Sequence, residues 1–176
     1  MPFWQWHFVM KQLTLFWLVQ SIILPSSLAL LEEPFVAFES SPGALPIHDS
    51  PIIFAGDDFK GVRIAAESLS SDLTEITGTK TTLLDSTKAN FSTVYGLASA
   101  IIVGSINSTI IRNLGGNGTN SSFAFAELEG KWETFSTQVV KNPLPGVASA
   151  LVIAGSDKRG AIFGVHTLAE QCGQSP

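Results

Sequence analysis

Apolar residues along this chain recur in two patterns, which predict helices and strands. Residues 62–78 place apolar side chains every three or four positions on one face and polar side chains on the other. Because Gly78 closes this segment with a stop signal, it predicts an amphipathic helix. Strands are predicted for four short apolar runs and one alternating segment, at residues 51–55, 80–84, 97–103, 151–154 and 132–140.

Two further helices complete the pattern, and together the elements predict the fold class. A short helix is expected within residues 106–114, and a final helix begins near Ser156 or Asp157 and stops at Gly173. Strands and helices therefore mix along the chain. This order predicts an α/β sandwich, in which helices pack mainly on one face of a small mixed sheet.

Three side chains are assigned structural roles by their place in this pattern. Asp57 and Asp58 precede the first helix, where we expect them to cap it. Trp132 lies in the alternating segment, so we expect it in the core rather than on an exposed platform that stacks on sugars.

The first turn of the final helix carries two cations, Lys158 and Arg159, directly after the predicted cap. Cations there oppose the helix dipole, at about 0.3–1 kcal/mol each. Together with the free N–H groups of a helix start, they would welcome an anion. Alternatively, Asp157 or a carboxylate elsewhere in the protein forms a structural ion pair, and most such arrangements are structural.

The known nucleotide, hydrolase and metal motifs are not met. Gly155 and Gly160 have phosphate-loop spacing, but Ala161 and Ile162 replace the required Lys and Ser/Thr. We therefore predict no catalytic residue, metal or cofactor in this chain. A glycosidase needs two carboxyl groups, one on each side of the scissile bond. The candidates form no persuasive pair; they are Glu127, Glu129, Glu133, Asp57 and Asp58. Glu127 and Glu129 are expected on one solvated strand face, and neither His48 nor His166 adjoins a nucleophile motif.

The N-terminus has the pattern of a secretory signal peptide. Residues 13–24 are an apolar run, Pro25 breaks it, and small residues precede a cleavage point near Ala29. Residues 1–29 are therefore predicted to be removed, which leaves residues 30–176 as a single domain. An uncleaved membrane anchor is the alternative, although the run is shorter than the roughly 20 residues that span a bilayer.

The predicted mature chain is acidic and has features of a secreted, extracellular glycoprotein. Without Lys11 it has 9 Lys+Arg against 15 Asp+Glu, a net charge of −6, which argues against nucleic acid and anionic membranes as partners. Its single cysteine, Cys172, allows no internal disulfide and is expected to be buried and inert. Glycosylation is predicted at the four Asn-x-Ser/Thr sequons, Asn90, Asn107, Asn117 and Asn120.

Several segments resemble one enzyme family. The string GSDKRG at 155–160, followed by IFG at 162–164 and LAEQ at 168–171, resembles the end of the N-terminal domain of family 115 glycoside hydrolases, the xylan α-1,2-glucuronidases. The helix at 62–78 and the GKWETF segment at 130–135 resemble the same domain, in the same order. A looser glycine pattern in residues 160–168 is similar to the corresponding domain of hexosaminidases.

The resemblance implies a non-catalytic α/β domain that precedes a catalytic (β/α)₈ barrel, with this chain ending before the barrel. The parent enzyme would remove (4-O-methyl)glucuronic acid from xylan, so the implied partners are the barrel and, through it, glucuronoxylan. Within that enzyme, the turn of Asp157, Lys158 and Arg159 would face the barrel, and its two cations would help hold an anion near the barrel's mouth, either a protein carboxylate or the uronate itself. The alternatives are a free-standing secreted carbohydrate-binding or interaction module, or an inactive truncated product.

Overall fold

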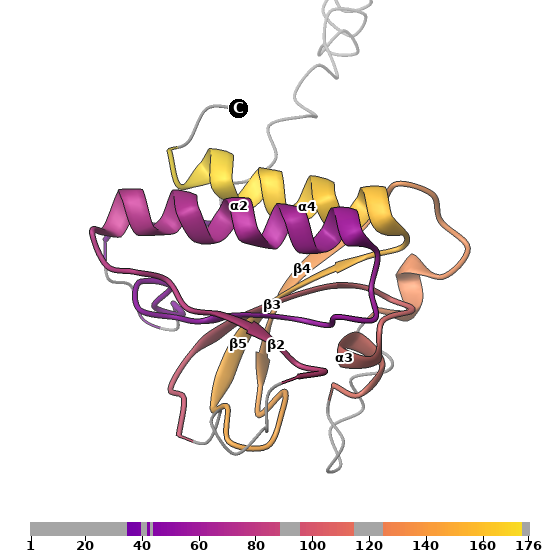
Figure 1. The fold of residues 1–176 in the computed structure, drawn as a ribbon, viewed down its shortest axis with the longest axis horizontal. Helices are drawn as coiled ribbons and strands as arrows, with labels where there is room; N and C mark the ends of the chain where they lie inside the picture. The colour runs from indigo at the N-terminus through magenta and orange to yellow at the C-terminus, as the bar shows by residue number, and fades with distance from the viewer. Residues whose placement is uncertain (1–34, 40–41, 43, 89–95, 115–124, 174–176) are drawn as a thin grey trace, which may run out of the picture. The chain divides into compact units, whose positions relative to one another are not determined.

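A computed structural model describes residues 35–39, 42, 44–88, 96–114 and 125–173, and the predicted signal peptide lies outside this part of the chain. The described residues form a five-stranded sheet in the order β2-β1-β3-β5-β4 (Figure 1). The strands are β1 (Ile52–Phe54), β2 (Leu83–Asp85), β3 (Ala100–Ser105), β4 (Phe135–Lys141) and β5 (Ser149–Gly155). The predicted α/β class is confirmed.

The sheet is mixed because one edge strand runs against the others. β1, β2, β3 and β5 pair in parallel, whereas β4 pairs antiparallel to β5 from Phe135 opposite Gly155 to Lys141 opposite Ser149. The carboxyl ends of the four parallel strands and the start of β4 therefore meet at one edge. We call this the carboxyl edge of the sheet.

Two long helices cover one face of the sheet, as the sequence pattern predicts. These are α2 (Lys60–Thr77) and α4 (Lys158–Gln171), which lie alongside each other above the strands in Figure 1. Alternate strand side chains point toward them and join one buried cluster, among them Ile52, Ile101 and Ile153. At about 25 cal/mol per Å² of buried apolar surface, this cluster is the main source of stability on this face.

Shorter elements cover the opposite face. The intervening strand residues, such as Ile53, Ile102 and Val152, pack in a second buried cluster against α3 (Thr109–Arg112), the 3₁₀ helix η3 (Ala126–Leu128) and nearby loops. Strands buried on both faces read as continuous apolar runs, which is why the sequence showed runs rather than alternation. Among the described residues, no helix is long and apolar enough to cross a membrane.

Element boundaries differ from the sequence prediction where backbone conformation decides them. β4 begins at Phe135 rather than at residue 132, because Glu133 has a φ of +52° and cannot continue a strand. Leu97 forms only an isolated bridge with Val147, so β3 starts at Ala100. The predicted end of α2 is confirmed, since Gly78 has a φ of +69° and its N–H reaches the carbonyl of Thr74.

Three glycines allow α4 to approach the sheet closely. A Cβ atom at Gly155 would overlap the backbone of Ala161, and one at Gly160 would overlap the carbonyl oxygen of Thr134. At Gly164 a Cβ would lie 2.6 Å from Ile153 Cγ2. The spacing that resembles a phosphate loop is therefore explained by helix–strand packing.

We expect Gly160→Ala to lower the free energy of unfolding by at least about 2 kcal/mol, because the new methyl group meets backbone that cannot move aside. Gly61→Ala is the matched control in the first turn of α2. Its Cβ would lie 3.1 Å from the flexible end of Ile162, so a stabilising change of up to about 1 kcal/mol is expected. Urea denaturation of both variants measures this contrast, and equal stability for the two would contradict the packing argument.

Candidate functional site

Of the two cap residues that the sequence offers, Ser156 and Asp157, it is Asp157 that caps α4, and it also holds the neighbouring segment. Its Oδ1 atom accepts hydrogen bonds from the N–H groups of Arg159 and Gly160, both at 2.8 Å. Its Oδ2 atom accepts the N–H of Glu133 at 2.9 Å. One carboxylate therefore joins the start of α4 to the segment that leads into β4, at the carboxyl edge of the sheet.

The two cations beside this cap have different surroundings. Arg159 Nη1 lies 2.7 Å from Glu133 Oε1, and its guanidinium carbon lies 5.8 Å from the centre of the Phe163 ring. Lys158 is exposed, and no ion-pair partner for it is found in the described part of the chain. The protein's own carboxylates thus occupy the start of α4, as in the structural alternative, while a role of Asp157, Lys158 and Arg159 near substrate stays a prediction.

These hydrogen bonds change the acidity of Asp157. The N–H donors of Glu133 and Gly160 lower the pKa of its carboxyl below the ordinary value, and partial burial opposes them only in part. Asp157 is consequently ionised at neutral pH, and its negative charge is stabilised by the positive end of the helix dipole.

Asp57 and Asp58 do not cap α2, and that prediction is wrong. Phe59 occupies the N-cap position and makes no side-chain cap. Asp58 instead accepts the N–H of Ser105 at 2.7 Å and its hydroxyl at 2.9 Å, while Asp57 accepts the hydroxyl of Thr109 at 3.0 Å. Asp58 joins the segment after β1 to the end of β3, and Asp57 joins it to the start of α3, because the parallel sheet brings these ends together.

The remaining ionisable candidates are dispersed. Glu127 lies in η3 and Glu129 in the turn after it, so the strand face predicted for them is wrong. His48 is exposed and lies 3.1 Å from Asp49, and His166 is exposed on α4. Cys172 is buried at the end of α4, where burial raises the pKa of its thiol, in agreement with an inert residue.

Trp132 is exposed rather than buried, which overturns the core position predicted for it. The side chain keeps 78% of its accessible surface, since it precedes β4 and lies outside the sheet. The preceding Gly130, with a φ of +71°, and the polar Lys131 are turn signals that favour this outcome. The argument against a sugar-binding platform, which relied on a buried Trp132, therefore no longer applies.

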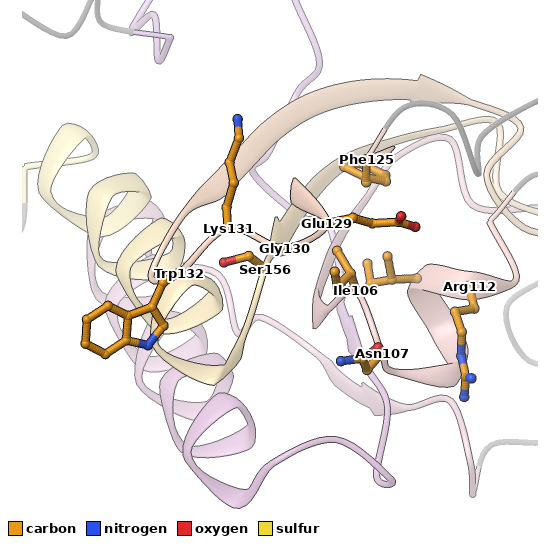
Figure 2. Close-up of a pocket in the computed structure, with 10 residues that line it drawn as sticks. Ile106, Asn107, Arg112, Phe125, Glu129, Gly130, Lys131, Trp132 and Ser156 are labelled. Atoms are coloured by element: carbon orange, nitrogen blue, oxygen red, sulfur yellow. The ribbon is translucent and has the colours of Figure 1, made fainter. Parts of the chain in front are cut away.

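Trp132 lies on the rim of a hollow of about 860 Å³ at the carboxyl edge. Ile106 and Ile111 line it after β3, and Phe125 and Ser156 line it from the other side. Figure 2 shows the polar side chains of Asn107, Arg112, Glu129 and Lys131 around it, with the Trp132 indole extending outward beside α4. Apolar walls with a few polar groups are typical of ligand sites, so this hollow is the candidate site of the chain.

Of the four predicted glycosylation sites, Asn107 lies in the described part of the chain. Its side chain is exposed on the rim of the hollow, in agreement with an accessible acceptor. Asn90, Asn117 and Asn120 lie outside the described residues.

Among solved structures, this chain is similar to a stretch of a family 115 enzyme. No protein-family model matches the chain, and neither does any curated protein. A solved structure described as a novel family GH115 4-O-methyl-alpha-glucuronidase, BtGH115A, with specificity for decorated arabinogalactans, is 26% identical with a TM-score of 0.49. The match covers 72% of this chain and 14% of that chain, so the likeness is to one short stretch of a much longer enzyme.

We expect Asp157→Ala to lower the free energy of unfolding by about 1–2 kcal/mol at pH 7, because the variant loses the helix cap. Because the pKa of Asp157 is lower in the folded protein, its carboxylate contributes to folding stability at pH values above the unfolded pKa, near 3.8. This contribution is lost as the pH falls through the folded pKa. The difference from wild type should therefore narrow below about pH 4.

Urea denaturation at pH 7, 5 and 3 measures this dependence. Glu75→Ala, on the exposed face of α2, serves as the control. If the free energies of unfolding of Asp157→Ala and wild type differ by the same amount from pH 7 to pH 3, the folded protein does not hold the carboxylate in its ionised form.

Proposed function

We propose that this chain is a non-catalytic α/β domain of a secreted glycoside hydrolase resembling those of family 115. Its parent enzyme would remove (4-O-methyl)glucuronic acid from xylan. The observation that carries the proposal is the direct contact between the two segments on which the resemblance mainly rests, residues 130–135 and 155–160.

The contacts between these segments are numerous and specific. The N–H of Thr134 donates to Ser156 Oγ at 3.1 Å, and the N–H of Ser156 donates to the Thr134 carbonyl at 2.8 Å. Asp157 accepts from the N–H of Glu133, whose own carboxylate contacts Arg159. Residue types in both motifs are therefore explained by a single structural unit, which supports kinship in the fold of this domain rather than in catalysis.

The same contacts support a non-catalytic role. Glycoside hydrolysis needs two carboxyl groups across the scissile bond, one of them free to donate a proton. The Asp157 carboxylate accepts three backbone N–H groups, the Glu133 carboxylate contacts Arg159, and Asp58 is bound to Ser105. These acids are occupied in holding the fold.

The isolated chain, expressed in a eukaryotic secretory host, is expected to release no glucuronic acid from glucuronoxylan. The product is also expected to begin near Leu30 and to lose mass on removal of N-glycans. A full-length family 115 enzyme that acts on glucuronoxylan is the positive control for the assay of released acid. Acid release by the chain alone would overturn the non-catalytic assignment, and retention inside the cell would overturn secretion.

The anion-binding role of the α4 turn is tested in a full-length relative that carries both cations. If the turn holds an anion near the active site, alanine in place of the residue matching Lys158 or Arg159 should raise KM for glucuronylated substrate severalfold. In the isolated chain, Arg159→Ala should lower stability by about 1 kcal/mol through loss of the Glu133 contact, and Lys158→Ala by much less. Unchanged KM together with this stability difference would leave the turn a structural ion pair.

A further inference from the structure

We propose that the hollow beside Trp132 binds an acidic polysaccharide, with a pyranose ring stacked on the indole and a carboxylate held by Arg112 or Lys131. This proposal does not depend on the proposed function. It is argued from the surface of this chain alone, and the site would stand in a free-standing binding module as well as in an enzyme domain.

The exposed indole is the first observation. Trp132 leaves 78% of its surface in water, although a tryptophan normally contributes more than any other side chain to a core or an interface. Large apolar side chains held at the surface beside a hollow mark binding sites. The indole face is flat and apolar, and it fits the C–H face of a pyranose ring.

The polar rim matches the edge of such a ring. Glu129 offers carboxylate acceptors and Lys131 offers ammonium donors, and both are exposed on the rim. Sugar hydroxyls donate and accept hydrogen bonds equally well, so mixed groups of this kind suit them. Ile106 and Phe125 form apolar walls between these polar groups, and a volume of about 860 Å³ accommodates a short oligosaccharide.

The charge of the side chains at the hollow favours acidic sugars over neutral ones. Arg112 and Lys131 are exposed at the hollow, and within the described ranges neither has an ion-pair partner. The other arginines, Arg63 and Arg159, are both paired. Two unpaired cations against the single carboxylate of Glu129 give the rim a net positive charge on an otherwise acidic protein. An arginine can bind a carboxylate through two parallel hydrogen bonds, so a uronate suits this rim better than a neutral sugar.

The test is calorimetric titration of the full chain with polygalacturonate and with its methyl ester, which has the same backbone without the charge. Trp132→Ala should weaken binding of polygalacturonate at least about fivefold, in keeping with the loss of one aromatic contact. Phe38→Ala is the matched control, because Phe38 is 79% exposed and does not line the hollow. Thermal melting shows whether each variant keeps its fold.

Charge is tested with a second pair of variants. Arg112→Ala combined with Lys131→Ala should weaken binding of polygalacturonate and make it less sensitive to salt, with little effect on the methyl ester. Lys80→Ala, an exposed lysine beyond the end of α2, should leave both unchanged.

Trp132 also supplies an optical signal, since it is the only tryptophan after residue 17. Subtracting the fluorescence spectrum of Trp132→Phe from that of wild type isolates the emission of Trp132. This emission should change when polygalacturonate is added and should not change when NaCl is added at an equal concentration.

Three titration results would overturn the proposal. The first is no saturable binding of polygalacturonate, and the second is an equal loss of affinity in Trp132→Ala and Phe38→Ala. The third is that the methyl ester binds as tightly as polygalacturonate and that binding does not depend on Arg112 and Lys131. Self-association of the chain that Trp132→Ala abolishes, without sugar binding, would also overturn it and assign the indole to a protein contact. Failure of acid release in the hydrolase assay has no bearing on any of these results.

Discussion

The close approach of α4 to β4 and β5 is the constraint on which the carboxyl edge depends. Gly155, Gly160 and Gly164 leave no room for side chains at this contact, so the helix start lies directly against the strand backbone. That approach brings Asp157 within hydrogen-bond distance of the segment that enters β4. The cap of one element thereby becomes a link between two.

This link also explains why the candidate hollow exists. Glu133 adopts a φ of +52° while its N–H is held by Asp157, and the chain before it turns away from the sheet. Trp132 is consequently placed on the rim instead of in the core. On the other side of the hollow, Asp58 holds the end of β3, from which Ile106 and Asn107 follow. Asp157 and Asp58 thus position the segments that line the hollow.

The resemblance to family 115 hydrolases and the sugar site are separate conclusions with separate support. The first depends on motifs whose residues hold the fold together, which is why they indicate kinship and not chemistry. The second depends on Trp132, Arg112 and Lys131, whose side chains are exposed at the hollow. A domain can keep the motif residues while the side chains at the hollow change, so each conclusion requires its own experiment.

Local sequence determined the two long helices, the apolar strands, their order, a cap at Ser156 or Asp157 and the glycine stop of α2, because each depends on residues within one or two turns of each other. It did not determine the partners of Asp58, Glu133 or Arg159, nor the exposure of Trp132. Those depend on which strand ends meet at the carboxyl edge and on one positive φ angle, and sheet order and close helix packing are decided by contacts between residues far apart in the chain.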